Sequence, residues 1–301
     1  RFPALSPDGR RIVYAARSRL WVQALDEWEP RELAGTEGGV RPFWSPASDW
    51  IGFFRNEQLL KIPAAGGPVV SIATLPAVQA PLFSSSAVWS DEGTIFLSQA
   101  AGPQIYRVPG GGGELKAHYT LPEATGFDVH DLAPLPSGGL VMAVHRADGV
   151  GALAVLADGN LTIVLEASNV ANPQYSPSGH IVFARAAPNA GLWAVPFNAP
   201  GRTVTGEPFL IGRGTEPSLA RDGTLVFLGA EHAMEVLEIS QRMLFGAPDA
   251  GLLDRQAAFH DGLLRSLGVR LTGDDLQRMN GFEVFEVVYE SEEVRSMPAA
   301  L

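Results

Sequence analysis

The stretch RPFWSPASDWIGFF (residues 41–54) decides the fold, because the same pattern already stands at RFPALSPDGRRIVYAA (residues 1–16). In both stretches a short piece with Pro near its start leads into a Ser-Pro turn. A dense apolar run follows the turn in each case. Two copies of one pattern indicate an internal repeat, and the period of a repeat is a strong guide to the architecture.

The turn after the first strand recurs six times along the chain. Its anchor position falls at Gly9, Ser48, Gly93, Gly138, Gly179 and Gly223, at intervals of 39, 45, 45, 41 and 44 residues. A β-rich run follows each anchor, and the middle of a second run lies roughly 13 to 16 residues past it, as expected for short strands joined by turns. Glycine at most of the anchors supplies the positive φ that a tight hairpin needs.

Short strands at regular spacing with turn signals between them predict an all-β fold. A period of about 40 to 45 residues with four strands per unit is typical of β-propellers. Solenoids of helix pairs have repeats of similar length, but here Val, Ile, Phe and Tyr alternate with period 2 and helical periodicity is absent. The sequence therefore predicts a six-bladed β-propeller with four-stranded antiparallel blades.

The propeller is predicted to cover residues 1–240, followed by a divergent and partly helical tail at 241–301. Its blades are expected approximately at residues 1–40, 41–79, 80–127, 128–169, 170–213 and 214–240. In the tail, residues 251–268 are typical of a short amphipathic helix, and Thr272 begins a second helix signal. Residues 282–290 predict a strand, which either completes the last blade or belongs to something else.

Composition excludes several classes of function. The net charge of −11 and a pI of about 5.0 argue against nucleic-acid binding, which needs a basic surface. The chain has no cysteine, which excludes thiol nucleophiles, thiolate metal sites and disulfides. It has no run of 18 apolar residues, so we expect no membrane insertion within it. It starts at Arg1, and we expect it to be a segment of a longer protein.

Motifs that would carry catalysis or bind a cofactor are missing or incomplete. No G-x-S-x-G nucleophile elbow exists, so the chain holds no recognisable hydrolase site. The stretch at 201–207 has the glycine spacing of a P-loop, but Glu207 stands where lysine is required. No two histidines have the spacing of a metal site, and His130 and Asp131 are adjacent, which places them on opposite faces of a strand. We predict no catalytic residue, metal or cofactor.

Five tryptophans recur at equivalent places in the repeats and are predicted to pack between blades rather than to form a ligand cage. They are Trp21, Trp44, Trp50, Trp89 and Trp193.

One constellation of polar residues remains as a candidate site. In a propeller the starts of the innermost strands surround one mouth of the central channel, where polar groups converge on a ligand. The predicted ring consists of Phe2, Arg41, Ser86, Asp131, Asn172 and Glu216. It fits a ligand with donors and acceptors, including a cationic group that faces Asp131 and Glu216. The alternative is a water-filled vestibule with solvated side chains.

Several stretches of the chain resemble a known family. SPDGRRIVYAA (6–16) and SPSGHIVFARA (176–186) resemble the PD40 (WD40-like) repeats of TolB-type propellers. The stretches at 20–54 and 192–211 are similar to blades of the sensor propellers found C-terminal to bacterial serine/threonine kinases. The resemblance covers about residues 1–240. It departs from the family at Ala47-Ser48, where the family usually has Asp-Gly, and in the tail.

This resemblance implies a non-catalytic recognition or scaffold propeller. It would be the extracytoplasmic, periplasmic sensor region of a membrane-anchored bacterial kinase or regulator, with a protein, peptide or small-molecule partner at the propeller face. The alternative is the substrate-gating propeller of a serine peptidase whose catalytic domain lies outside this segment. A propeller glycosidase or lyase would need clustered carboxylates at the mouth, where only Asp131 and Glu216 qualify.

Overall fold

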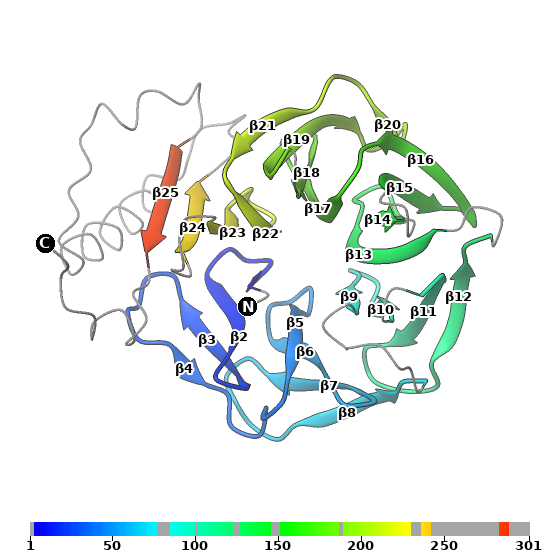
Figure 1. Cartoon of the computed structure of the whole chain (residues 1–301). Helices are drawn as coiled ribbons and strands as arrows, with labels where there is room; N and C mark the ends of the chain where they lie inside the picture. Colours follow the sequence, from blue (N-terminus) through cyan, green and yellow to red (C-terminus); the bar gives the residue numbers. More distant parts are fainter. Residues whose placement is uncertain are drawn as a thin grey trace, which may run out of the picture.

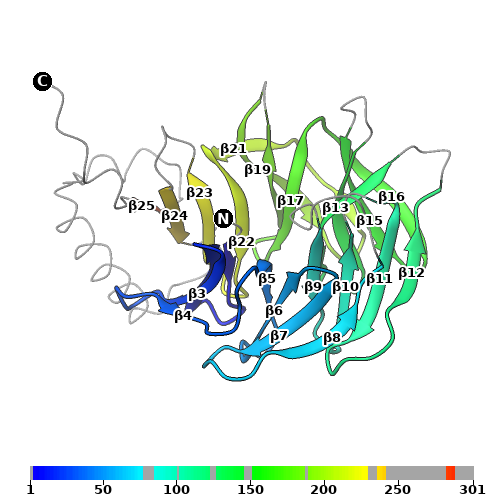
Figure 2. The ribbon, with the colours of Figure 1, turned by 60° about the horizontal axis from the view of Figure 1, so that its bottom comes forward.

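The chain folds as sheets that radiate from a central axis (Figure 1). A computed structural model describes residues 3–76, 85–99, 102–122, 127–145, 151–186 and 189–229, and the backbone of 236–241 and 283–288. These residues contain strands and turns but no helix. Each sheet is built from one continuous segment and is antiparallel throughout, with its strands in chain order from the axis outward. The fifth sheet departs from the predicted four strands, because its fourth and fifth strands both pair with its third. Figure 2 shows the inner strands running along the axis.

We number the sheets 1 to 6 in chain order. Sheets 1 to 3 are formed by β1 (Ala4–Leu5), β2 (Arg11–Ala16), β3 (Arg19–Ala24) and β4 (Arg31–Glu32); β5 (Val40–Trp44), β6 (Trp50–Arg55), β7 (Gln58–Pro63) and β8 (Val70–Thr74); and β9 (Ser86–Trp89), β10 (Thr94–Ser98), β11 (Gln104–Pro109) and β12 (Lys116–Thr120). Sheets 4 to 6 are formed by β13 (Asp128–Pro134), β14 (Leu140–His145), β15 (Gly151–Ala157) and β16 (Asn160–Glu166); β17 (Val170–Ser176), β18 (His180–Arg185), β19 (Gly191–Asn198), β20 (Thr203–Val204) and β21 (Phe209–Gly212); and β22 (Gly214–Leu219), β23 (Leu225–Gly229), β24 (Val236–Gln241) and β25 (Glu283–Val288).

The predicted all-β propeller is confirmed. Sheets 1 to 5 form five complete blades where six were predicted. In sheet 6 only the backbone of β24 and β25 is described. The strand expected at 282–290 is present as β25 and pairs with β24. The helix signals at 251–268 and Thr272 lie outside the described residues, and the division at residue 240 stays a prediction.

One turn geometry recurs in all six sheets and explains the repeat. At each predicted anchor, the residue has positive φ and its backbone N–H donates to the carbonyl three residues earlier. Ser48 adopts this conformation, with φ of 60°, although it is not glycine. Its Oγ accepts a hydrogen bond from the backbone N–H of Asp8 in sheet 1, at 3.2 Å. Ser48 therefore lacks the conformational freedom of the glycine that the family usually has there, but its side chain makes a contact between neighbouring sheets.

The core lies between neighbouring sheets, where their apolar faces meet. Between sheets 4 and 5, Val141 and Leu153 pack with Ile181 and Phe183, and all four are fully buried. Each such side chain contributes about 2 kcal/mol relative to an exposed one. Sheets 1 and 2 share a similar cluster that contains Phe53. Burial of this kind along the described part of the ring fixes the positions of the inner strands, and so of the channel.

Sheet 1 lies directly beside sheet 6, although the two are far apart in sequence (Figure 1). The backbone N–H of Leu5 donates to Ser218 Oγ at 2.9 Å. The backbone N–H of Arg221 donates to the Pro7 carbonyl at 3.1 Å. These contacts join the two sheets without any exchange of strands between them.

The described part of the chain contains no helix that could span a membrane.

Gly52 offers a test of how tightly a blade is packed. Gly52 pairs with Phe43 across β5 and β6, and the Phe43 ring lies over it so closely that an added Cβ would overlap the ring. We expect Gly52→Ala to lower the free energy of unfolding by about 1 to 3 kcal/mol, as overpacking does. The control is Gly111→Ala, because a Cβ at Gly111 meets nothing within 4 Å. Urea unfolding of both variants measures the difference; equal stability would contradict the packing.

Candidate functional site

Four of the six predicted ring residues share a backbone feature at the start of the inner strands. Arg41, Asp131, Asn172 and Glu216 all have positive φ, of 51°, 38°, 51° and 53°. Each lies at a break in the pairing register of its inner strand, a β-bulge. Asn and Asp tolerate this conformation, whereas Arg and Glu pay about 1 kcal/mol or more for it. Backbone strain that recurs in several sheets is a feature of functional sites.

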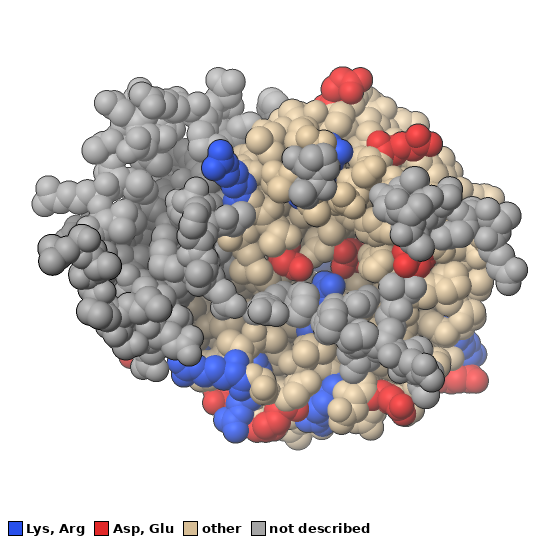
Figure 3. Space-filling model, in the orientation of Figure 1, with Lys and Arg blue, Asp and Glu red and all other residues tan. Residues whose placement is uncertain are grey.

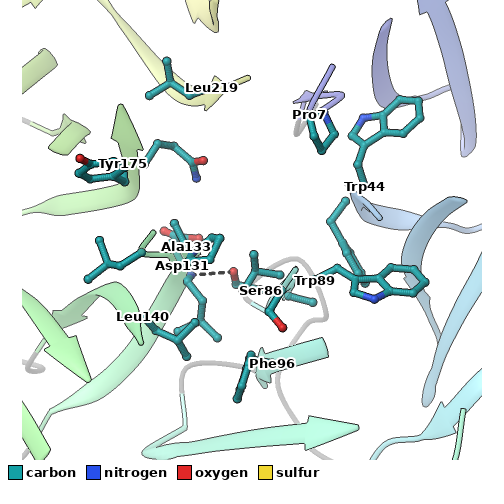
Figure 4. Close-up of a pocket in the computed structure, with 18 of the residues that line it drawn as sticks. Pro7, Trp44, Ser86, Trp89, Phe96, Asp131, Ala133, Leu140, Tyr175 and Leu219 are labelled. Atoms are coloured by element: carbon teal, nitrogen blue, oxygen red, sulfur yellow. Dashed lines mark hydrogen bonds between the residues drawn. The ribbon is translucent and has the colours of Figure 1, made fainter. Parts of the chain in front are cut away.

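Proline follows the positive-φ residue in sheets 2, 5 and 6. Pro42, Pro173 and Pro217 lie inside the bulges, where no ladder hydrogen bond is needed from their nitrogen. In sheet 4 the corresponding residue is Leu132, which does have an N–H. It donates to Ser86 Oγ in sheet 3 at 3.0 Å (Figure 4, dashed line). The early proline of the repeat therefore marks a bulge, which the sequence pattern alone does not reveal.

The bulges bring side chains from four sheets into one polar network at the channel. Arg41 Nη1 lies 3.3 Å from Asp131 Oδ1 and 3.8 Å from Glu216 Oε2. The backbone N–H of Asn172 donates to Asp131 Oδ2 at 3.0 Å, and the Asn172 side-chain amide donates to Glu216. The charged side chains are only 12% to 21% exposed. Charges of both signs lie together at the centre of the face in Figure 3.

The structure thus brings five of the six predicted residues to the channel. Ser86 also lines the cavity, and its hydroxyl oxygen accepts the hydrogen bond from the backbone N–H of Leu132 in sheet 4. Phe2 lies outside the described residues. That these residues bind a ligand stays a prediction.

Glu216 is the member of the network whose ionised form is disfavoured. Burial raises its pKa above the ordinary value, and the nearby negative charge of Asp131 adds to this. Arg41 and the hydrogen bond from Asn172 act in the opposite direction. Among the described side chains one cation, Arg41, faces two carboxylates, and burial favours the neutral form of Glu216.

A cavity of about 960 Å³ runs from this network along the inner strands. Its walls are mostly apolar and carry several aromatic rings. Trp44 and Trp89 lie on one side and Tyr175 on the other, with Leu219 and Phe96 between them (Figure 4). Arg41, Asp131, Asn172 and Glu216 supply the polar groups at one end. A cavity of this size, with apolar walls and a few convergent polar groups, suits a small ligand.

A second ion pair spans the opposite mouth of the channel. Arg221 of sheet 6 and Asp91 of sheet 3 follow the inner strands of sheets that lie on opposite sides of the axis (Figure 1), and both residues line the cavity. Their side chains form an ion pair although they are 59% and 76% exposed. Such an exposed pair is weak and opens readily. The channel therefore has a buried charged network at one end and a solvated ion pair at the other.

The tryptophans do more than pack between blades. Trp44 belongs to the core between sheets 1 and 2 and donates its indole N–H to the Ala4 carbonyl at 2.8 Å. Trp89 packs in the core between sheets 2 and 3, and Lys61 lies over its ring. Both also line the cavity, which the sequence did not predict. Trp21 and Trp193 are equivalent: Trp21 donates to the Ala16 carbonyl at the end of β2, and Trp193 donates to the Asn189 carbonyl just before β19.

Two histidines and an aspartate meet on sheet 4, next to the polar network. Asp128 Oδ1 lies 3.1 Å from His130 Nε2, and the rings of His130 and His145 are 4.8 Å apart. Burial lowers the pKa of His145, and the neighbouring His130 lowers it further. The sequence predicts no metal site because His145 stands on the next strand, outside any recognised spacing. Only strand pairing brings it to the other two.

The fold is similar to those of solved propellers. TolB from Acinetobacter baumannii gives a TM-score of 0.54 at 18% identity, over 72% of this chain and 56% of that one. A calcium-binding protein, regucalcin from Agrobacterium tumefaciens, gives 0.50 at 16% identity, over 83% and 89%. The PQQ-bound aldose sugar dehydrogenase from Streptomyces coelicolor gives 0.56 at 14% identity, over 76% and 88%.

These similarities show the fold alone. The resemblance to TolB-type propellers is supported at the level of the fold, whereas the likeness to kinase sensor propellers stays a prediction. No family model matches the sequence, and neither does any curated protein. Because the structural neighbours include a calcium-binding protein and a dehydrogenase, function has to be argued from this chain's own site.

The two ion pairs across the channel should differ in their effect on stability. Arg41→Leu leaves Asp131 and Glu216 mostly buried without their cation, and we expect a loss of about 3 kcal/mol. Arg221→Leu removes the exposed ion pair with Asp91, and we expect the free energy of unfolding to fall by less than about 1 kcal/mol. Chemical denaturation of the two variants measures both losses. Similar losses would contradict the structural role of the buried network.

The raised pKa of Glu216 predicts how the stability of the protein changes with pH. Because its pKa is raised in the folded protein, ionisation is less favourable there than in the unfolded chain. As the pH rises from 4.5, its ordinary value, through the raised value, we expect the native protein to lose stability relative to Glu216→Gln. Thermal unfolding at a series of pH values measures this difference. A change of opposite sign would mean that the Arg41 pairing outweighs burial.

Proposed function

We propose that the chain is a non-catalytic recognition propeller that binds a small ligand, or the end of a peptide, in its central cavity. The observation that carries this proposal is the cavity of about 960 Å³ with aromatic walls and a buried, strained polar network at one end. Rigid walls and polar groups already held in place reduce the ordering cost of binding.

The network favours a ligand that carries a positive charge. Arg41 is the one cation among the described side chains of the network, and it faces both Asp131 and Glu216. The backbone N–H of Asn172 supports Asp131 from the other side. A cationic group that approaches Glu216 from the cavity would stabilise its ionised form, which burial opposes. The aromatic side chains Trp44, Trp89 and Tyr175 fit the apolar body of such a ligand, and aromatic faces also attract cations.

We also infer that sheet 6 closes the ring as a sixth blade. The hydrogen bonds from Leu5 to Ser218 and from Arg221 to Pro7 support this inference, as does the packing of β22 against sheet 5. The pairing of β25 with β24 gives this sheet four strands, as in sheets 1 to 4. A closed ring would make the cavity a permanent feature of the molecule.

The wider setting is proposed from the resemblance of the sequence. We place the domain outside the cytoplasm, as the sensor region of a membrane-anchored bacterial kinase or regulator. The alternative, a substrate-gating propeller of a peptidase, needs a channel through which a chain can pass. The buried charged network across one mouth supports a binding cavity over an open passage.

Matched probes on one aromatic ring test the proposal. Tryptamine, indole-3-ethanol and indole-3-propionate offer a cationic, a neutral and an anionic group on the same indole. We expect tryptamine to bind more tightly than the alcohol, and the propionate to bind most weakly, in isothermal titration calorimetry. Replacing both acids, in Asp131→Ala with Glu216→Ala, should remove the preference for the amine.

The variant Arg221→Leu serves as the control, because it lies at the far mouth of the same channel. It should keep the preference for the amine. Equal binding of the three probes, or a preference that survives loss of both acids, would contradict a cation site at the network.

A further inference from the structure

We infer that Asp128, His130 and His145 form a binding site for a transition-metal ion of the Zn²⁺ class. The three residues offer one carboxylate oxygen and two imidazole nitrogens, and these atoms all lie within 4.8 Å of one another. This site is separate from the ligand cavity, which Asp128, His130 and His145 do not line.

Strand pairing puts all three side chains on one face of the β13–β14 hairpin. Asp128 and His130 are two residues apart on β13 and therefore point to the same side. His145 on β14 is the direct cross-strand partner of Asp128. Val129 and Val144 pair on the other face and are fully buried against sheet 3. The cluster thus stands on rigid backbone, which holds metal ligands better than a loop does.

The atoms already have the separation that two ligands of one ion need. Bonds of about 2.0 to 2.1 Å to an ion place neighbouring ligand atoms about 3 Å apart. Asp128 Oδ1 and His130 Nε2 are 3.1 Å apart. That oxygen is buried and has no hydrogen bond of acceptable geometry among the described residues. A buried carboxylate oxygen without a hydrogen bond is costly, and coordination of an ion would satisfy it.

The surroundings of His145 also suit a ligand. Its ring forms a hydrogen bond with the backbone of Val170 in sheet 5. Histidine ligands commonly donate their second ring nitrogen to a backbone carbonyl, which fixes the orientation of the ring. Asp128 and Asp131 both act on His145 as negative charges, which would favour a bound cation. The site therefore lies between sheets 4 and 5, beside the polar network.

The donor set selects the class of metal. Two imidazoles and one carboxylate favour Zn²⁺, Ni²⁺ or Co²⁺ over Mg²⁺ and Ca²⁺, which prefer oxygen ligands. Three protein ligands leave at least one coordination position for water or another molecule. The cluster is partly exposed, with 26% of the His130 side chain and 34% of Asp128 accessible, so an ion can enter.

Calorimetric titration of the intact chain with ZnCl₂ tests the site. We expect one ion bound per chain with a dissociation constant in the micromolar range or tighter, and no comparable binding of Mg²⁺ or Ca²⁺. Co²⁺ should give the visible absorption of a four- or five-coordinate ion, which Zn²⁺ then displaces. Absence of Zn²⁺ binding by a folded wild-type chain would overturn the inference.

Variants locate the ion. His130→Ala, His145→Ala and the isosteric Asp128→Asn should each weaken Zn²⁺ binding about tenfold or more. His180→Ala is the matched control, since His180 is also partly buried on a strand but lies outside the cluster, and it should bind Zn²⁺ like the wild type. Circular dichroism and thermal unfolding confirm that each variant is folded. Unchanged affinity in folded His130→Ala and His145→Ala, or equal loss in His180→Ala, would refute the site.

Discussion

The pairing of Arg41 with Asp131 and Glu216 is the interaction on which the centre of this molecule depends. The three side chains come from sheets 2, 4 and 6, so the network connects sheets that share no strand pairs. Each charge is mostly buried and has its partner within 4 Å. Removing Arg41 leaves two poorly solvated carboxylates behind, which costs more than the ion pairs themselves contribute. The same ion pairs therefore set the charge at this end of the channel and hold sheets 2, 4 and 6 in place around it.

The backbone makes this network possible at an energetic cost. A regular strand would direct alternate side chains into the packing between sheets, whereas a bulge re-aims one residue toward the axis. Arg41 and Glu216 accept positive φ to reach that position. A fold that needed only stability would place Gly or Asn there. Long charged side chains in a strained conformation are the observation that supports the proposed role of this end of the channel in recognition.

The sequence predicted the repeat, the turn positions and the column of ring residues, because all three follow from local chemistry. Turn residues that recur every 39 to 45 positions, and proline six residues before four of the six turns, are visible without coordinates. The bulges are not, since Arg41 and Glu216 carry no signal for positive φ. The Asp91–Arg221 pair and the meeting of His145 with Asp128 depend on how sheets and strands are placed, which no single motif records.

The junction between sheets 1 and 6 has a kinetic consequence. Every strand pair in the described chain joins strands of one sheet, so each sheet can form from local sequence. The contact from Leu5 to Ser218 spans 213 positions and can form only after the sheets between them are in place. Loop-closure entropy makes such contacts late events in folding. Until then the channel is an open crescent, and both its charged network and its aromatic wall face water.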